Sequence, residues 1–124
     1  MNWLWLATGG VCGALCRFHG ARLIQARWRG NFPVGSLVIN LTGCCLLGLL
    51  TGLFLRHSLW PVMQLRLLLA TGFCGAYTTF SSFAFEAVQL WRQGQRRQAL
   101  LHLVGQPLVG VGLAWSCLLW GRQL

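Results

Sequence analysis

The densest group of polar residues in this sequence lies inside a long apolar run, between Thr71 and Phe83. Two glycines and the consecutive residues Thr78 and Thr79 make this stretch a poor centre for a helix. A helix that is interrupted inside a membrane can turn its free backbone amides and carbonyls toward an ion. Free carbonyls would suit a hard cation such as sodium. The composition therefore predicts a broken helix whose backbone groups are available to an ion.

Two phenylalanines follow the threonines. Phe80 and Phe83 are three residues apart, so they would share one face of a helix. The edges of their rings carry partial positive charge, and two such edges could flank a small anion. The same spacing fits two ordinary packing residues, next to hydroxyls that bond back to their own helix. The sequence leaves both interpretations open.

Asn40 is a single amide in the middle of an uncharged apolar stretch, residues 32–55. A buried polar group needs a partner, because leaving it unpaired is costly. The amide could form a hydrogen bond between two membrane helices. It could also donate an N–H to an anion. Both roles remain open on the sequence alone.

Glu86 is the only acidic residue, and this scarcity excludes several kinds of site. Catalysis by a pair of carboxylates and a carboxylate cage for a metal are both excluded within one chain, so we do not expect an enzyme. Proton-coupled export of cations normally uses a carboxylate embedded in an early helix, and the first half of the chain has none. The net charge of +9, carried entirely by arginines, better suits an anion that passes arginine-rich vestibules.

The elements that must position these residues are membrane helices. Hydrophobic residues make up 56% of the chain and charged residues 9%, against about 25% charged residues in a soluble domain. A bilayer is crossed by about 20 mostly apolar residues. Four such runs occur, at about residues 3–24, 32–55, 67–91 and 98–121. We therefore predict an all-α membrane protein in which residues 1–124 form a single domain of four transmembrane helices, the third of them broken.

The arginines lie between the apolar runs, so they are better explained as topology signals and headgroup anchors than as a nucleic-acid surface. We expect the lipid bilayer as a partner and no nucleic acid. Four spans put both termini on one side, together with a second loop around Ser58 and Pro61. The arginine bias favours the first and third loops in the cytoplasm, but it is moderate, and some copies could insert the other way. Four short helices enclose little space, so a pore would need a second subunit.

All six cysteines lie inside apolar runs. A structural metal site needs about four convergent ligands, and no histidine or third thiol accompanies the pair Cys12 and Cys16. We expect the cysteines to be small packing residues between membrane helices, and we expect no disulfide at membrane depth.

Three stretches of the chain resemble the Fluc (CrcB) family of fluoride channels. Residues 9–18 are similar to the family's Gly-Gly-x-x-Gly-Ala-x-x-Arg-aromatic opening. Residues 32–43 are similar to its Pro-x-Gly-Thr-x-x-x-Asn-x-x-Gly stretch, with Ser36 in the threonine place. Residues 72–86 are very close to the family's most diagnostic segment. Length and the four-span layout agree as well, so the resemblance covers nearly the whole chain.

The resemblance implies an antiparallel, dual-topology homodimer in a bacterial inner membrane, which exports fluoride passively through two pores. Phe80 and Phe83 match the phenylalanines that line these pores, and Asn40 matches the pore asparagine. Arg17 matches an arginine of the vestibule. Donors that would replace the water lost by fluoride are the Asn40 amide, the two ring edges, and the hydroxyls of Thr79 and Ser82.

The resemblance also implies one structural sodium ion at the dimer interface, which is not transported. Backbone carbonyls at the helix break would hold this ion, and the matching residues are Gly75 and Thr78. The arginine bias leaves room for an alternative pairing, in which an oppositely oriented paralogue takes the place of the second copy.

The fourth span departs from the family pattern. The family commonly has a tyrosine there and a serine four residues later, and the matching positions hold His102 and Gln106, followed by Pro107. Both side chains can form hydrogen bonds, and Gln106 could replace a hydroxyl donor. Because a histidine can titrate near neutral pH, we expect activity that depends on pH.

Three other functions are possible for a small membrane bundle. A drug exporter of this size would need a carboxylate in the first span, which is absent. A lipid-modifying enzyme would need catalytic acids that the chain does not have. A structural subunit without transport activity can be separated from a channel only by measuring flux.

Overall fold

Helices make up almost all of the structure, a computed structural model that describes residues 1–57 and 62–124, and no strand occurs in these ranges. Of the predicted second loop, Ser58 and Pro61 lie outside the described residues. In chain order the helices are α1 (Asn2–Arg27), α2 (Val34–Arg56), α3 (Val62–Leu65), η1 (Arg66–Cys74), α4 (Gly75–Tyr77), α5 (Phe80–Arg92), α6 (Arg96–Leu100), η2 (Leu101–Gly105) and α7 (Gln106–Gly121). The elements η1 and η2 are wider π-helical turns that continue directly into α4 and α7.

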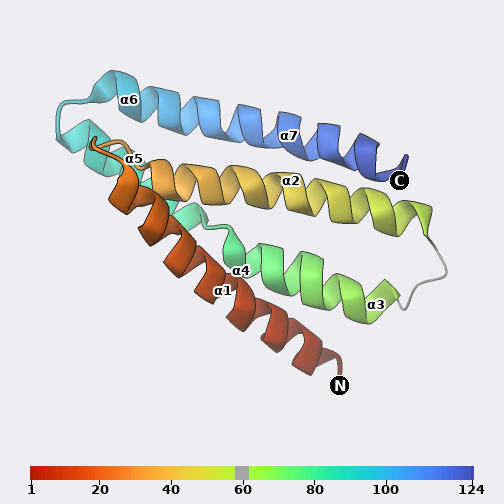
Figure 1. Cartoon of the computed structure of the whole chain (residues 1–124). Coiled ribbons are helices and arrows are strands. Elements are labelled where there is room, and N and C mark those ends of the chain that lie inside the picture. Colours follow the sequence, from red (N-terminus) through yellow and green to blue (C-terminus); the bar gives the residue numbers. More distant parts are fainter. Residues whose placement is uncertain (58–61) are drawn as a thin grey trace.

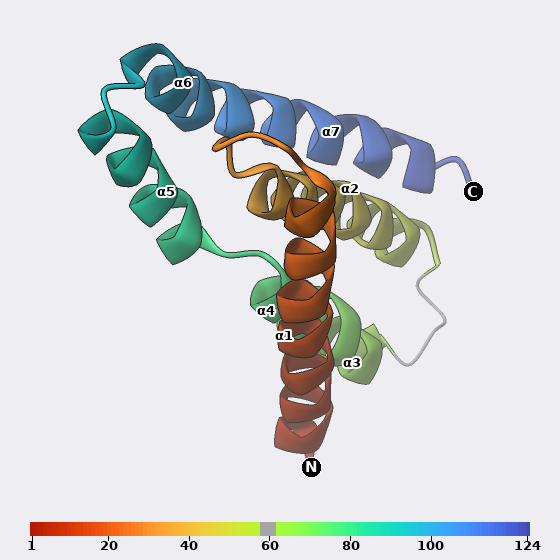
Figure 2. The same ribbon diagram turned by 60° about the vertical axis from the view of Figure 1, so that its left-hand side comes forward.

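Two helix pairs form the bundle. α2 lies along α7, and α1 packs across η1 and α4 (Figure 1). Figure 2 shows α5 leaving the line of α4 and turning toward α6, against which it packs. Both α4 and α5 also contact α2. The junction between α4 and α5 therefore faces the helix that carries Asn40.

Three helical stretches of the described chain are long and apolar enough to cross a membrane: Val34–Arg56, Met63–Arg92 and Arg96–Gly121. They confirm an all-helical, multi-pass membrane protein. α1 has 26 residues but is not among these stretches, and it carries three arginines, Arg17, Arg22 and Arg27. A fourth crossing by α1 stays a prediction. Large apolar side chains such as Leu108, Val111 and Trp115 point outward, which suits a surface covered by lipid or protein.

Glycines bring the paired helices into backbone contact. A Cβ atom added at Gly48 would collide with the carbonyl oxygen of Ala114 on α7, and one added at Gly9 would collide with the carbonyl oxygen of Leu68 on η1. Small residues at such places let membrane helices approach closely. Glycines therefore set the close approach of α2 to α7 and of α1 to η1.

The prediction that no disulfide forms at membrane depth was wrong for one pair. Cys45 of α2 and Cys117 of α7 form a disulfide, and their Cα atoms lie 5.5 Å apart. The close approach of α2 to α7 at neighbouring glycines brings these two positions within reach of a disulfide. The other four cysteines are free thiols, and of these Cys74 is buried.

Candidate functional site

The junction between α4 and α5 consists of two residues with extended backbone angles. Thr78 has φ −83° and ψ 156°, and Thr79 has φ −145° and ψ 122°. Thr78 caps the end of α4, and Thr79 caps the start of α5. The N–H and the hydroxyl of Thr78 both donate to the carbonyl oxygen of Cys74, each at 3.0 Å, at the end of α4. The hydroxyl oxygen of Thr79 accepts the N–H of Ser82 at 3.2 Å and so caps the first turn of α5.

This junction leaves two carbonyls without the donors they would have in a continuous helix. There, the N–H of Thr79 would bond to Gly75 and the N–H of Ser82 would bond to Thr78, each four residues back. The N–H of Thr79 instead donates to the Asn40 side chain, and the N–H of Ser82 donates to the Thr79 hydroxyl. The carbonyl oxygens of Gly75 and Thr78 are thereby released from helical hydrogen bonding and are the kind of ligand that a hard cation prefers.

Asn40 of α2 holds the junction from the side. Its Nδ2 donates to the carbonyl oxygen of Thr79 at 3.1 Å, and its Oδ1 accepts the N–H of Thr79 at 2.9 Å. The side chain is buried, and these two bonds satisfy both backbone groups of an extended residue at once. Of the two roles open from the sequence, the interhelical hydrogen bond is present. A primary amide has two N–H groups, so one remains for another acceptor.

The two phenylalanines of α5 differ sharply in their surroundings. Phe83 is 7% exposed, whereas Phe80 is 79% exposed. Their ring centroids lie 5.8 Å apart with the planes tilted by 48°. The Phe83 ring also lies 5.0 Å from the ring of His102. Phe83 therefore belongs to the interior beside η2, and Phe80 belongs to the outer surface of a single chain.

Hydroxyl groups continue from the junction along the start of α5. The Thr79 hydroxyl lies 3.2 Å from the Ser81 hydroxyl and 3.3 Å from the Ser82 hydroxyl. These three oxygens line a polar pocket of about 490 Å³. Its other polar lining residues come from α1, α2 and α5: Arg17, Arg22, Gln25, Ser36 and Glu86.

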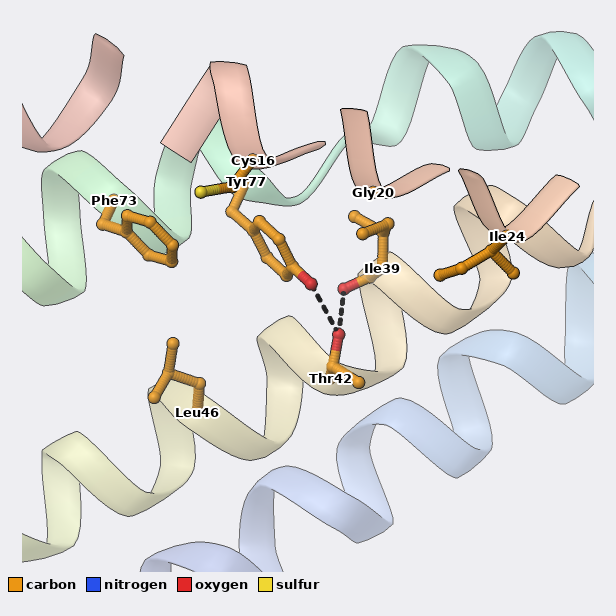
Figure 3. Close-up of a pocket in the computed structure, with 8 residues that line it drawn as sticks. All are labelled: Cys16, Gly20, Ile24, Ile39, Thr42, Leu46, Phe73 and Tyr77. Atoms are coloured by element: carbon orange, nitrogen blue, oxygen red, sulfur yellow. Dashed lines mark hydrogen bonds between the residues drawn. The ribbon is translucent and has the colours of Figure 1, made fainter. Parts of the chain in front are cut away.

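A second, more apolar pocket of about 640 Å³ lies beyond the junction. Thr79 lines this pocket as well as the polar one, so the junction lies between the two. The other predicted site residues that line the second pocket are Asn40, Gly75, Thr78, Phe80, Phe83 and Gln106. A third pocket of about 540 Å³ lies on another side of α2, where the hydroxyls of Thr42 and Tyr77 meet at 3.0 Å (Figure 3). None of the predicted site residues lines this third pocket.

The fourth-span residues lie next to these pockets. His102 is 1% exposed and Gln106 is 9% exposed. Among the described residues, no hydrogen-bond partner is found for either ring nitrogen of His102 or for Oε1 of Gln106. The ring of Phe32 meets the His102 ring edge-on at a centroid distance of 5.6 Å. Three buried polar atoms of the fourth span are therefore left without a hydrogen bond in the described part of the chain.

Glu86 and Ser36 join the site although the sequence did not assign them to it. The Ser36 hydroxyl donates to Oε2 of Glu86, and Nε2 of His102 lies 3.5 Å from the same oxygen. The available signal in the sequence was that Glu86 is the only acidic residue. Its contacts with Ser36 of α2 and His102 of η2 depend on how the helices pack, which the order of residues in the sequence does not reveal.

Comparisons with known proteins agree on one family. The family model described as "CrcB-like protein, Camphor Resistance (CrcB)" matches residues 4–118. The chain is 44% identical over 115 residues to a protein of Moorella thermoacetica named "Fluoride-specific ion channel FluC 2", covering 93% of this chain and 92% of that one. It is 38% identical over 123 residues to a "Fluoride-specific ion channel FluC" of Maridesulfovibrio salexigens, covering 99% and 94%. A protein of the same name from Chlorobium phaeobacteroides is 42% identical over 121 residues, covering 98% and 90%.

Proposed function

Because the chain belongs to the CrcB-like family, a family of ion channels and not of enzymes, we propose that it is a fluoride-selective channel that lets fluoride leave the cell passively. The names of its relatives support fluoride as the ion. The observation that carries the proposal is the extended junction at Thr78 and Thr79, which lies between a polar and an apolar pocket.

The proposed path enters through the polar pocket. Arg17 and Arg22 line it and raise the local concentration of anions. Inside, the hydroxyls of Thr79, Ser81 and Ser82 can donate to a fluoride ion that has lost part of its water. A small, strongly hydrated anion gains most from such closely spaced donors, and a larger halide gains less.

The path continues past the junction into the apolar pocket. The remaining N–H of Asn40, the edges of the Phe83 and Phe80 rings, and the amide N–H groups of Gln106 are the donors along its wall. His102 lines neither pocket, and its ring lies 5.0 Å from the Phe83 ring, next to this route.

A second copy of the chain completes the proposed channel. The apolar pocket is lined by apolar side chains of α2, η1 and α7, and Phe80 beside it is 79% exposed. An antiparallel, dual-topology homodimer would cover this surface, and an oppositely oriented paralogue is the alternative partner. We place the dimer in a bacterial inner membrane, with residues 1–124 as one domain and α1 as its fourth crossing.

A structural sodium ion at the dimer interface fits the released carbonyls. Gly75 and Thr78 both line the pocket that the second copy would cover. Two carbonyls from each of two copies would surround a hard cation more completely than one chain can. The ion would stabilise the break and would not be transported.

Fluoride efflux from liposomes tests the proposal. Purified protein is reconstituted into vesicles loaded with potassium fluoride, and release is followed with a fluoride electrode after valinomycin is added. We expect efflux from the wild type, and we expect Phe80→Ile combined with Phe83→Ile to reduce it to the rate of protein-free vesicles. The matched control is Phe85→Ile, because Phe85 is an exposed phenylalanine of the same helix and lines neither pocket. Efflux that survives the double substitution would favour a structural subunit without a transport role.

A further inference from the structure

A buried histidine lies beside the only acidic side chain of the protein. His102 is 1% exposed, and among the described residues neither of its ring nitrogens has a hydrogen-bond partner. Its Nε2 lies 3.5 Å from Oε2 of Glu86. Buried polar atoms almost always have partners, so two bare nitrogens on one ring call for an explanation. The rings of Phe32 and Phe83 flank the imidazole, and neither can accept its proton as an oxygen does.

Glu86 is held in place facing this ring. The Ser36 hydroxyl from α2 donates to the same oxygen, Oε2, that lies near His102. The carboxylate side chain is 22% exposed and forms part of the wall of the polar pocket. Glu86 therefore contacts both the interior histidine and the route by which fluoride would enter.

The charge of the other ionised groups around Glu86 and His102 does not change with pH. Arg17 and Arg22 of α1 line the same pocket as Glu86, and an arginine keeps its charge at every physiological pH. The neighbour from α2, Ser36, and the next polar residue of the fourth span, Gln106, are both neutral. Any change of charge in this part of the protein therefore comes from Glu86 and His102.

The charge of the pair decides how a fluoride ion meets the pocket wall. With one proton bound, as an imidazolium next to a carboxylate, the pair has no net charge. Without that proton, the pair carries one negative charge, which repels an anion in the pocket. The proton comes from water in the polar pocket, binds at Nε2 of His102, and returns to water when it leaves.

We propose that Glu86 and His102 form a proton-binding site beside the anion path, and that the bound proton increases fluoride conduction. This inference rests on the proposed channel function. It predicts that conduction is fastest in acid, where the proton is bound, and falls as pH rises and the proton leaves. Acid pH is also the condition under which a cell takes up more hydrogen fluoride, so conduction would rise with demand.

Flux measured against pH tests the proposal. Vesicles with equal pH inside and outside are compared between pH 5.5 and 8.5, and the leak of protein-free vesicles at each pH is subtracted. We expect wild-type efflux to fall at least about threefold across this range. Glu86→Gln keeps an acceptor for Ser36 but removes the negative charge, so it should retain fast efflux at high pH. His102→Gln should give slow efflux that no longer depends on pH.

His19→Gln is the matched control, because His19 is an exposed histidine on α1 outside both pockets, and it should keep the wild-type pH dependence. Wild-type efflux that is constant across the range would overturn the proposal while leaving the channel function intact. Retained pH dependence in His102→Gln would overturn it as well.

A second measurement does not depend on flux. NMR spectra of protein labelled with ¹⁵N at histidine follow the ring nitrogens of His102 during a pH titration. We expect Glu86→Gln to change the ring signals of His102 and to leave those of His19 unchanged, because Oε2 of Glu86 lies 3.5 Å from Nε2 of His102. Unchanged His102 signals would contradict the site even if the protein conducted no fluoride at all. Changed His102 signals without any fluoride flux would support the site and refute the channel.

Discussion

Replacing Asn40 by alanine should destabilise the whole fold, because one side chain satisfies two backbone groups of the helix junction. The Nδ2 and Oδ1 atoms of Asn40 pair with the carbonyl oxygen and the N–H of Thr79 at 3.1 and 2.9 Å. Hydrogen bonds between membrane helices contribute about 0.6 kcal/mol each on average and up to about 1.7 kcal/mol. Two such bonds, lost from a buried place, predict a loss of about 1–3 kcal/mol for Asn40→Ala.

Equilibrium unfolding in mixed micelles measures this loss. The protein is titrated with sodium dodecyl sulfate, and tryptophan fluorescence reports the folded fraction. Thr51→Ala is the matched control on the same helix, because the Thr51 hydroxyl donates only within α2, to the carbonyl oxygen of Leu47 at 2.7 Å. We expect the control to change the free energy of unfolding by less than about 0.5 kcal/mol.

Asn40→Ala should also reduce fluoride efflux, because the N–H and the carbonyl of Thr79 lose the side chain that fixes their positions. If Asn40→Ala unfolds at the same detergent concentration as Thr51→Ala, the pairing with Thr79 does not hold the junction. The assignment of Asn40 as the residue that fixes the break would then be refuted.

The remaining predictions concern the contact between α2 and α7. Gly48→Val should lower stability by about 1–3 kcal/mol, because the added side chain overlaps a backbone carbonyl of α7, whereas Gly112→Val, whose Cβ meets no described atom within 4 Å, should be nearly neutral. Detergent unfolding measures both, and equal losses would contradict the close approach. Reduction of the disulfide between Cys45 and Cys117 should lower stability by about 2 kcal/mol. Unfolding curves that coincide with and without reductant would show that this link contributes nothing.

Composition and local pattern were sufficient for the class of the protein. Long apolar runs with few charges predicted membrane helices, and the described helices agree with that prediction. The motifs around Gly9, Asn40 and Thr78 predicted the family, which the comparisons confirm. Such features can be predicted from the sequence because the length of an apolar run and the helix propensity depend only on neighbouring residues.

Contacts between distant residues could not be predicted in the same way. Asn40 and Thr79 are separated by 39 residues, and their reciprocal pairing depends on how α5 approaches α2. Phe80 and Phe83 share a helix face by spacing, but that spacing does not reveal that only Phe83 lies under neighbouring helices. Cys45 and Cys117 are 72 residues apart in the sequence, and their approach likewise depends on the contact between α2 and α7. Each of these outcomes is set by helix packing.

Anion selectivity tests the central claim most directly. Vesicles containing the protein and loaded with equal concentrations of fluoride and chloride are measured with fluoride and chloride electrodes side by side. A channel whose donors replace the water of a small anion should release fluoride quickly and hold chloride at the rate of protein-free vesicles. Equal release of both ions, or no release of fluoride, would contradict it.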